Sequence, residues 1–112
     1  HYGMTKTAQL AVSRGLAATV AGTGVTVNTV MPGPTWSEGV EVFVQGMVSD
    51  PDKDFEAIEK EFFETARPGS LINRFATPEE IANLVTYVAS PLSSATTGAA
   101  LRVDGGVANF IL

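Results

Sequence analysis

Apolar residues recur every three or four positions in three stretches of the chain, and this spacing predicts three helices. The first runs over about 4–20 and presents a stripe of small residues that would let another helix or a sheet approach closely. This stripe consists of Ala8, Ala11, Gly15 and Ala18. The second helix covers 55–66. The third begins after Thr77, which can cap it, and Glu80 three residues later completes a capping box.

Two shorter stretches, about 25–31 and 98–103, are predicted to be strands. The first is rich in β-branched residues and runs into Pro32, Gly33, Pro34 and Thr35. There Gly33 permits close approach of another backbone or of a ligand, while a simple strand-terminating turn fits the local sequence equally well. The segment 36–46 follows no single period and fits either a helix over an apolar pocket or a mobile lid. The pattern as a whole indicates an α/β protein with three or four helices.

Composition narrows the function classes. The net charge is −5, and the acidic residues gather over 50–64, which is typical of a solvated face. No basic patch is visible, so we expect no nucleic-acid partner. Cysteine is absent and His1 is the only histidine, so we expect no metal site. The absence of cysteine is compatible with a reducing compartment, and the expected location is cytoplasmic. No apolar stretch reaches about 18 residues, so we expect no membrane partner. The apolar tail, 107–112, should pack against another surface.

One pair of residues suggests catalysis. Tyr2 and Lys6 are four residues apart, so on a helix they lie about 40° from each other round the axis. A phenol and an ammonium can then point into one pocket. A phenol acts as an acid or base near neutral pH when a nearby cation stabilises the phenolate. A single Tyr-x-x-x-Lys pattern is weak by itself and is also compatible with an accidental pairing.

Four landmarks follow one another in a definite order. These are the helix with Tyr2 and Lys6, a strand ending in 28–33 (Asn-Thr-Val-Met-Pro-Gly), the helix capped at Thr77, and a strand ending in 103–106 (Val-Asp-Gly-Gly). Their order and spacing resemble the C-terminal half of a short-chain dehydrogenase/reductase. The resemblance implies that 1–112 form the C-terminal part of a single Rossmann-like domain, a doubly wound parallel sheet with two of its strands here. The glycine-rich phosphate-binding turn, the NAD-or-NADP selector and a carbonyl-polarising serine would then lie upstream.

The resemblance also implies roles for residues and a cofactor, NAD or NADP. Tyr2 would be the general acid or base for a carbonyl or alcohol substrate. Lys6 would favour the ionised phenol and bind the nicotinamide ribose. The cofactor would also contact Pro32, Gly33, Thr35 through its backbone amide, and Ser37 through its hydroxyl. Four residues fall where the family's substrate-covering segment lies, with a structural role as an equal alternative: Trp36, Val40, Phe43 and Met47. The turn at 104–106 would be structural and near subunit contacts.

Three hypotheses about function remain. In the first, the parent protein is an oxidoreductase, whereas the isolated 112 residues are inactive, bind no cofactor and persist as a homo-oligomer. In the second, the chain is a non-catalytic oligomerisation or interaction module derived from that family. In the third, it is an unrelated helical scaffold in which Tyr2 and Lys6 are accidental. The choice between NAD and NADP, the substrate, the reaction direction and the oligomer number stay open at this stage.

Overall fold

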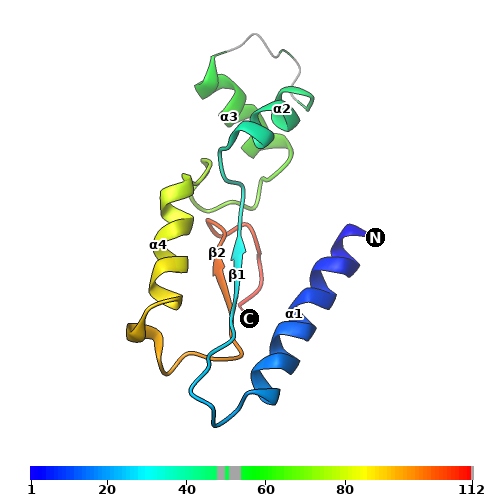
Figure 1. The fold of residues 1–112 in the computed structure, drawn as a ribbon. Helices are drawn as coiled ribbons and strands as arrows, with labels where there is room; N and C mark the ends of the chain where they lie inside the picture. Colours follow the sequence, from blue (N-terminus) through cyan, green and yellow to red (C-terminus); the bar gives the residue numbers. More distant parts are fainter. Residues whose placement is uncertain (48–49, 51–53, 112) are drawn as a thin grey trace. The chain divides into compact units, whose positions relative to one another are not determined.

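The structure is a computed structural model that describes residues 1–47, 50 and 54–111. In these residues the chain forms four α-helices, one 3-10 turn and two strands (Figure 1). In chain order the elements are α1 (Tyr2–Thr19), β1 (Thr29–Pro32), α2 (Glu38–Gln45), α3 (Phe55–Thr65), α4 (Pro78–Val88), η1 (Pro91–Ser93) and β2 (Ala100–Val103). The strands β1 and β2 pair as a parallel two-stranded sheet, which confirms the predicted fold class.

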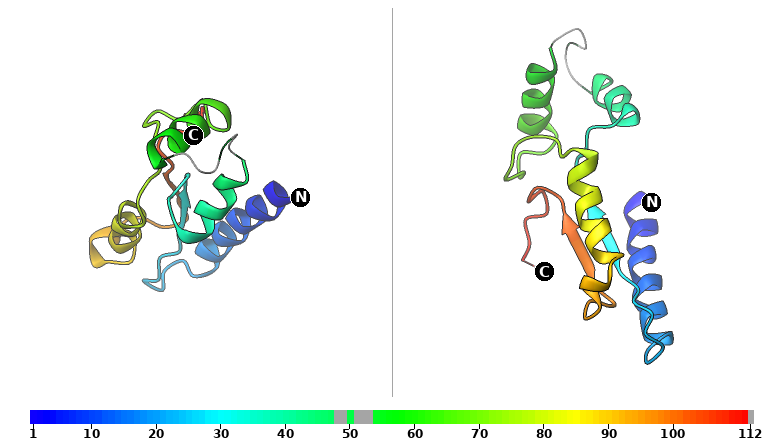
Figure 2. Two further views of the ribbon diagram at one scale, coloured as in Figure 1. Left: turned by 90° about the horizontal axis from the view of Figure 1, so that it is seen from above. Right: turned by 60° about the vertical axis from the view of Figure 1, so that its left-hand side comes forward.

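The chain divides into two compact units. The first comprises His1–Met31 with Ala82–Arg102, and the second comprises Pro32–Ile81 with Val103–Leu112. Both views in Figure 2 show α1 as one uninterrupted helix within the first unit.

The strand β1 begins at Thr29, later than the predicted residue 25, because a side chain takes over the pairing just before it. The amide of Asn28 donates from Nδ2 to the carbonyl of Thr96 (2.8 Å), and its Oδ1 accepts from the N–H of Ala99 (3.1 Å). In the segment before β2, Gly98 has a φ of +68°, a left-handed conformation that does not continue a strand. The regular ladder therefore starts only after these residues.

The small-residue stripe of α1 is exposed, and the helix buries Ala17 instead. Helix α1 starts at Tyr2, slightly before the predicted start, and ends at Thr19. Side chains as small as alanine and glycine bury little apolar area, so the stripe adds little to the stability of this unit as it stands. It remains a face on which another element can pack closely.

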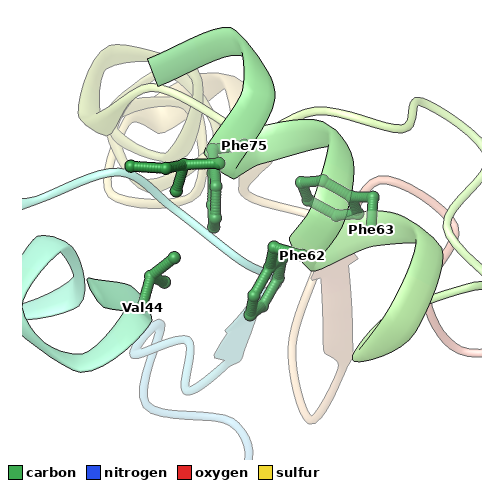
Figure 3. Packing of buried hydrophobic residues seen from close by; sticks show 5 residues of the cluster. Val44, Phe62, Phe63 and Phe75 are labelled. Atoms are coloured by element: carbon green, nitrogen blue, oxygen red, sulfur yellow. The ribbon is translucent and has the colours of Figure 1, made fainter. Parts of the chain in front are cut away.

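The core of the second unit is an aromatic cluster between α2, α3 and the segment before α4 (Figure 3). The ring of Phe75 lies 4.9 Å from that of Phe62 and 5.0 Å from that of Phe63, centroid to centroid. Such distances are typical of favourable aromatic pairs. Ile58 and the fully buried Val44 complete the cluster. The segment with no clear period is thus a helix, held to α3 by Val44.

The structure describes part of the apolar tail and part of the acidic run. Phe110 and Ile111 of the apolar tail are exposed, and Leu112 lies outside the described residues. Asp52 and Lys53 of the acidic run also lie outside them. Over the described ranges, none of the helices combines the length and apolarity that crossing a bilayer requires.

Candidate active site

Tyr2 and Lys6 occupy the first two turns of α1. The Nζ of Lys6 lies 5.5 Å from the centroid of the Tyr2 ring, and the Tyr2 side chain is 71% exposed. The hydroxyl of Thr5 donates to the carbonyl of Tyr2 (2.8 Å), while His1, at the N-cap position, makes no side-chain capping bond. The first turn of a helix favours negative charge because its N–H groups point toward the N-terminus. The phenol therefore has both a nearby ammonium and the positive end of a helix.

The Pro-Gly turn after β1 is shaped by a close backbone approach. The N–H of Gly33 donates to the carbonyl of Val103 (3.1 Å). A Cβ at position 33 would lie 2.5 Å from the carbonyl oxygen of Asp104 and 2.6 Å from its Cα. The sequence left open whether Gly33 accommodates a ligand or another backbone, and the structure shows that the backbone of Asp104 requires this glycine.

Thr35, two residues after this turn, has a backbone amide that points away from its strand partner. Thr35 forms a parallel bridge with Ala76, in which Ala76 donates to the carbonyl of Pro34 and accepts from the N–H of Trp36 (2.9 Å each). In parallel pairing the bridged residue's own N–H and C=O face the opposite side. Among residues 1–47, 50 and 54–111, none accepts a hydrogen bond from the Thr35 N–H. Its hydroxyl donates to the carbonyl of Gly33 (3.0 Å).

Ser37 is the N-cap residue of α2. Its backbone carbonyl accepts from the N–H groups of Val40 and Glu41 (2.9 Å each), and its exposed hydroxyl makes no capping hydrogen bond. This hydroxyl is therefore accessible to a ligand. It lies two residues from the outward amide of Thr35, within the same unit.

The four predicted substrate residues divide into two pairs. Trp36 and Val40 pack against the aromatic cluster, with the Trp36 ring 5.1 Å from that of Phe75. Phe43 and Met47 are 61% and 50% exposed. The first pair packs against the aromatic cluster and is partly exposed, whereas the second pair is mostly exposed to solvent. Sequence reasoning missed Val44 as a core residue, although its spacing of four from Val40 was an available signal.

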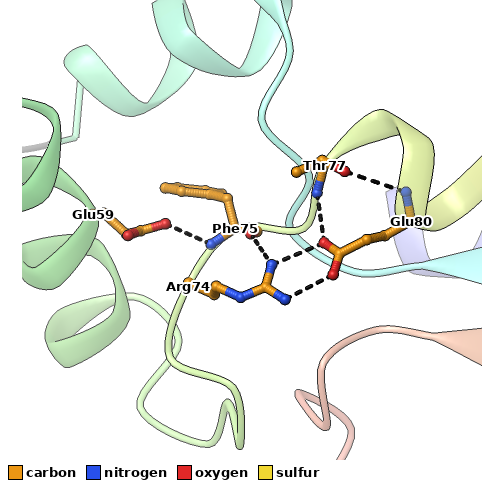
Figure 4. A network of polar contacts seen from close by, with 5 residues as sticks. All are labelled: Glu59, Arg74, Phe75, Thr77 and Glu80. Atoms are coloured by element: carbon orange, nitrogen blue, oxygen red, sulfur yellow. Dashed lines mark hydrogen bonds and ion pairs between the residues drawn. The ribbon is translucent and has the colours of Figure 1, made fainter.

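The second unit also contains a polar network, of which the sequence predicted only the capping box (Figure 4). The guanidinium of Arg74 binds both carboxylate oxygens of Glu80, Nη1 to Oε2 at 2.8 Å and Nη2 to Oε1 at 2.7 Å. Glu80 also accepts from the N–H of Thr77 (2.9 Å) and donates its own N–H to the Thr77 hydroxyl (3.3 Å). The predicted capping box is therefore present, with Arg74 added to it.

This network perturbs the titration of both charged groups. The hydrogen bond from Arg74, followed by that from the Thr77 backbone, lowers the pKa of Glu80 to about 2. The hydrogen bond to Glu80 and the charge of that carboxylate raise the pKa of Arg74 above its ordinary value. Glu80 is thus ionised throughout the neutral range, and the bidentate pair holds Arg74 in one geometry.

Two side chains of the network hold the peptide groups of Phe75. Its N–H donates to Oε1 of Glu59 on α3 (2.8 Å), and its carbonyl accepts from Nη1 of Arg74 (3.0 Å). The sequence assigned Glu59 to a solvated face, whereas the structure shows that it caps a buried aromatic residue's backbone. No periodic signal connects Glu59 with Phe75, because they are 16 residues apart in the chain.

The candidate residues fall into two sets. Tyr2 and Lys6 belong to the first unit, and the turn of 32–37 belongs to the second. Within the part of the chain that the structure describes, no group of three or more potential metal ligands gathers.

Over residues 1–108, the sequence matches a family described as enoyl-(acyl carrier protein) reductase. This is a family of short-chain dehydrogenases/reductases. Two similar proteins are the uncharacterized oxidoreductases YvaG and YvrD of Bacillus subtilis (strain 168). YvaG is 50% identical over 111 residues and YvrD is 47% identical over 106. These alignments cover 99% and 95% of this chain, but 42% and 40% of the two relatives.

The structure of L-sorbose reductase from Gluconobacter frateurii, complexed with NADPH and L-sorbose, is similar with a TM-score of 0.84 and 28% identity. The match covers 98% of this chain and 41% of that one. The chain thus spans about two fifths of the length of the relatives it matches. Its sequence, its parallel strand pair and its ordered landmarks agree, and the chain belongs to the short-chain dehydrogenase/reductase family.

Proposed function

We propose that the protein containing this chain is an NAD(P)-dependent oxidoreductase that transfers hydride between the cofactor and a carbonyl or alcohol substrate. The observation that carries the proposal is the placement of the Lys6 ammonium 5.5 Å from the ring centroid of Tyr2 on one side of α1. Membership of an oxidoreductase family supports it, as does the similar fold of a reductase complexed with NADPH.

In this proposal Tyr2 carries the proton. When bound, NAD(P)H would supply hydride for a carbonyl carbon, so that negative charge would develop on the carbonyl oxygen. A positioned phenol that donates its proton to that oxygen lowers the barrier, and in the reverse direction the phenolate accepts the proton of an alcohol. The ammonium of Lys6 stabilises the phenolate that remains. Lys6 also serves as the hydrogen-bond donor to the nicotinamide ribose.

The second unit provides the proposed contacts to the nicotinamide. The outward N–H of Thr35 donates to the carboxamide, and the hydroxyl of Ser37 adds a second polar contact. Pro32 and Gly33 would lie beside the nicotinamide, and the hydrogen bond from the Gly33 N–H to the carbonyl of Val103 fixes this turn. Thr35 and Ser37 fit the role because the Thr35 N–H bonds to no described residue and the Ser37 hydroxyl makes no capping hydrogen bond. Phe43 and Met47 are the proposed apolar contacts to substrate, whereas Trp36 and Val40 pack against the aromatic cluster of the same unit.

We propose further that residues 1–112 are the C-terminal part of one Rossmann-like domain. The match to two fifths of each relative supports this, and a two-stranded sheet is only marginally stable by itself. No Gly-x-Gly-x-x-Gly occurs in the chain, so we expect the isolated 112 residues to bind no cofactor and to be inactive. Saturable micromolar binding of NADH or NADPH to the isolated polypeptide would contradict that part of the proposal.

A second candidate function is a non-catalytic association module, and the exposed small-residue stripe of α1 favours it. A face of this kind permits close approach of another copy, so the proposal includes a homo-oligomer. Light scattering of the isolated polypeptide tests this, because a stable monomer contradicts it.

The test of the catalytic proposal is Tyr2→Phe in the whole protein. Removing the phenol hydroxyl should lower kcat for NAD(P)H oxidation with a carbonyl substrate by about 10²–10⁴-fold, the usual contribution of a positioned acid. The exposed position of Tyr2 predicts an unchanged fold. Tyr87→Phe is the matched control, since Tyr87 is also exposed and lies in the same unit. Equal turnover by Tyr2→Phe and the wild type removes Tyr2 as the acid.

A further inference from the structure

We propose that Arg74 is a positioning residue for the nicotinamide-binding turn: its guanidinium holds the Phe75 carbonyl and thereby orients the Thr35 amide across the Thr35–Ala76 bridge. This inference rests on the proposed function, because it assigns a purpose to the direction of the Thr35 amide. Arg74 itself touches neither substrate nor cofactor in this scheme. It acts through the backbone of two buried residues.

Hydrogen bonds to Glu80 hold the guanidinium of Arg74 in one geometry. Its two Nη atoms bind both oxygens of Glu80, and Glu80 is itself fixed by its two capping-box hydrogen bonds to Thr77. A bidentate guanidinium–carboxylate pair restricts the plane of the guanidinium as well as its position. The third contact, from Nη1 to the carbonyl of Phe75 at 3.0 Å, is therefore made by a group that is already immobilised (Figure 4).

The peptide between Phe75 and Ala76 connects Arg74 to the turn. Phe75 and Ala76 are buried, and both backbone groups of Ala76 bond to the turn, at Pro34 and at Trp36 (2.9 Å each). The peptide that Arg74 holds, between Phe75 and Ala76, therefore borders directly on this bridge. A rotation of that peptide changes the direction in which the N–H of Thr35 points.

Contacts that do not involve Arg74 hold the aromatic cluster and the start of α4. The aromatic contacts of Phe75 and the hydrogen bond from its N–H to Glu59 do not involve Arg74. The capping box of Thr77 and Glu80 also closes without Arg74. Loss of the guanidinium therefore leaves the cluster and α4 in place, and frees one carbonyl next to the bridge. The expected consequence is a misdirected amide in a folded protein.

The experiment compares cofactor affinities of the whole protein with those of Arg74→Gln and Arg74→Lys. Two probes are titrated: the reduced cofactor, and the corresponding ADP-ribose or its 2′-phosphate, which lacks the nicotinamide. Arg74→Gln should weaken the reduced cofactor by about three- to tenfold, the effect of one hydrogen bond, and leave the ADP-ribose affinity unchanged. The affinity of Arg74→Lys for the reduced cofactor should lie between those of the wild type and Arg74→Gln. An ammonium keeps the positive charge but cannot make the planar, bidentate contact of a guanidinium.

Lys60→Gln provides the matched control. Lys60 also forms an ion pair in the second unit, with Glu64 at 3.8 Å, but this pair is exposed on α3 and joins no part of the turn. The affinities of Lys60→Gln for both probes should equal those of the wild type, since exposed ion pairs contribute little to the stability of the fold. A loss in this variant similar to that of Arg74→Gln overturns the inference, because it would reflect charge alone.

The outcomes separate the two proposals. Equal affinities of Arg74→Gln and the wild type for both probes overturn the inference while the proposed function stands. An equal loss of affinity for both probes also overturns it, since that pattern indicates a general structural defect. If Arg74→Gln does not fold, Arg74→Lys decides, and unchanged binding of the reduced cofactor by this variant refutes the inference. A wild type that binds neither probe refutes the proposed function, and the inference with it.

Discussion

Replacing Gly33 by alanine in the whole protein should lower the free energy of unfolding by about 2 kcal/mol, mainly through overpacking. An ideal Cβ at this position would lie 2.5 Å from the carbonyl oxygen of Asp104, and two more atoms of that residue's backbone are within 2.7 Å. A methyl group needs roughly 3.5 Å from such atoms. The obstacle is backbone, so no side-chain rotation relieves the clash, and the hydrogen bond from Gly33 to Val103 must lengthen.

The magnitude follows from two opposing effects. Overpacking of this kind costs about 1–3 kcal/mol, and the upper end applies because the neighbour is main chain. Gly33 does not have a positive φ, so alanine can adopt its backbone conformation. Alanine has fewer conformations than glycine in the unfolded chain, and this effect stabilises the folded protein by about 0.4–1 kcal/mol. The difference leaves a net loss of about 2 kcal/mol.

The assay is urea-induced unfolding followed by circular dichroism, with Gly39→Ala as the control. Gly39 lies in the first turn of α2, and a Cβ there meets no atom within 4 Å. Alanine at 39 should therefore stabilise the protein by up to about 0.5 kcal/mol through helix propensity. A Gly33→Ala protein as stable as the wild type would refute the reasoning, and so would an equal loss in both variants.

Two further predictions concern the second unit. Because the pKa of Glu80 is lowered to about 2 in the folded protein, its carboxylate stabilises the fold above its ordinary pKa of 4.5, and this stabilisation is lost as the pH falls from 4.5 toward 2. The difference in unfolding free energy between the wild type and Glu80→Gln should thus shrink on acidification, and a difference independent of pH contradicts the assignment. Val44→Ala should cost about 2 kcal/mol by opening a cavity in the aromatic cluster. The exposed Val42→Ala should cost less than about 0.5 kcal/mol, and equal losses in urea unfolding would refute the packing argument.

The sequence by itself determined the features that depend on neighbours within one helical turn. The helices α3 and α4 lie where the apolar spacing predicted them, and the capping box of Thr77 and Glu80 forms as expected. Each depends on contacts between residues three or four positions apart, which a periodic pattern records directly. The order of the landmarks also indicated the family correctly, although no single landmark was specific.

The tertiary structure decided the features that depend on distant partners. The start of β1 follows from the Asn28 side chain, whose partners lie 68 and 71 residues away. The requirement for glycine at position 33 follows from Asp104, and the role of Glu59 follows from Phe75. Tertiary packing also decided that Val40 contacts the aromatic cluster whereas Phe43, on the same helix, is exposed. A hydrophobic pattern shows which side chains favour burial, but the path of the chain determines which backbone or ring they meet, because those contacts join residues with no fixed spacing.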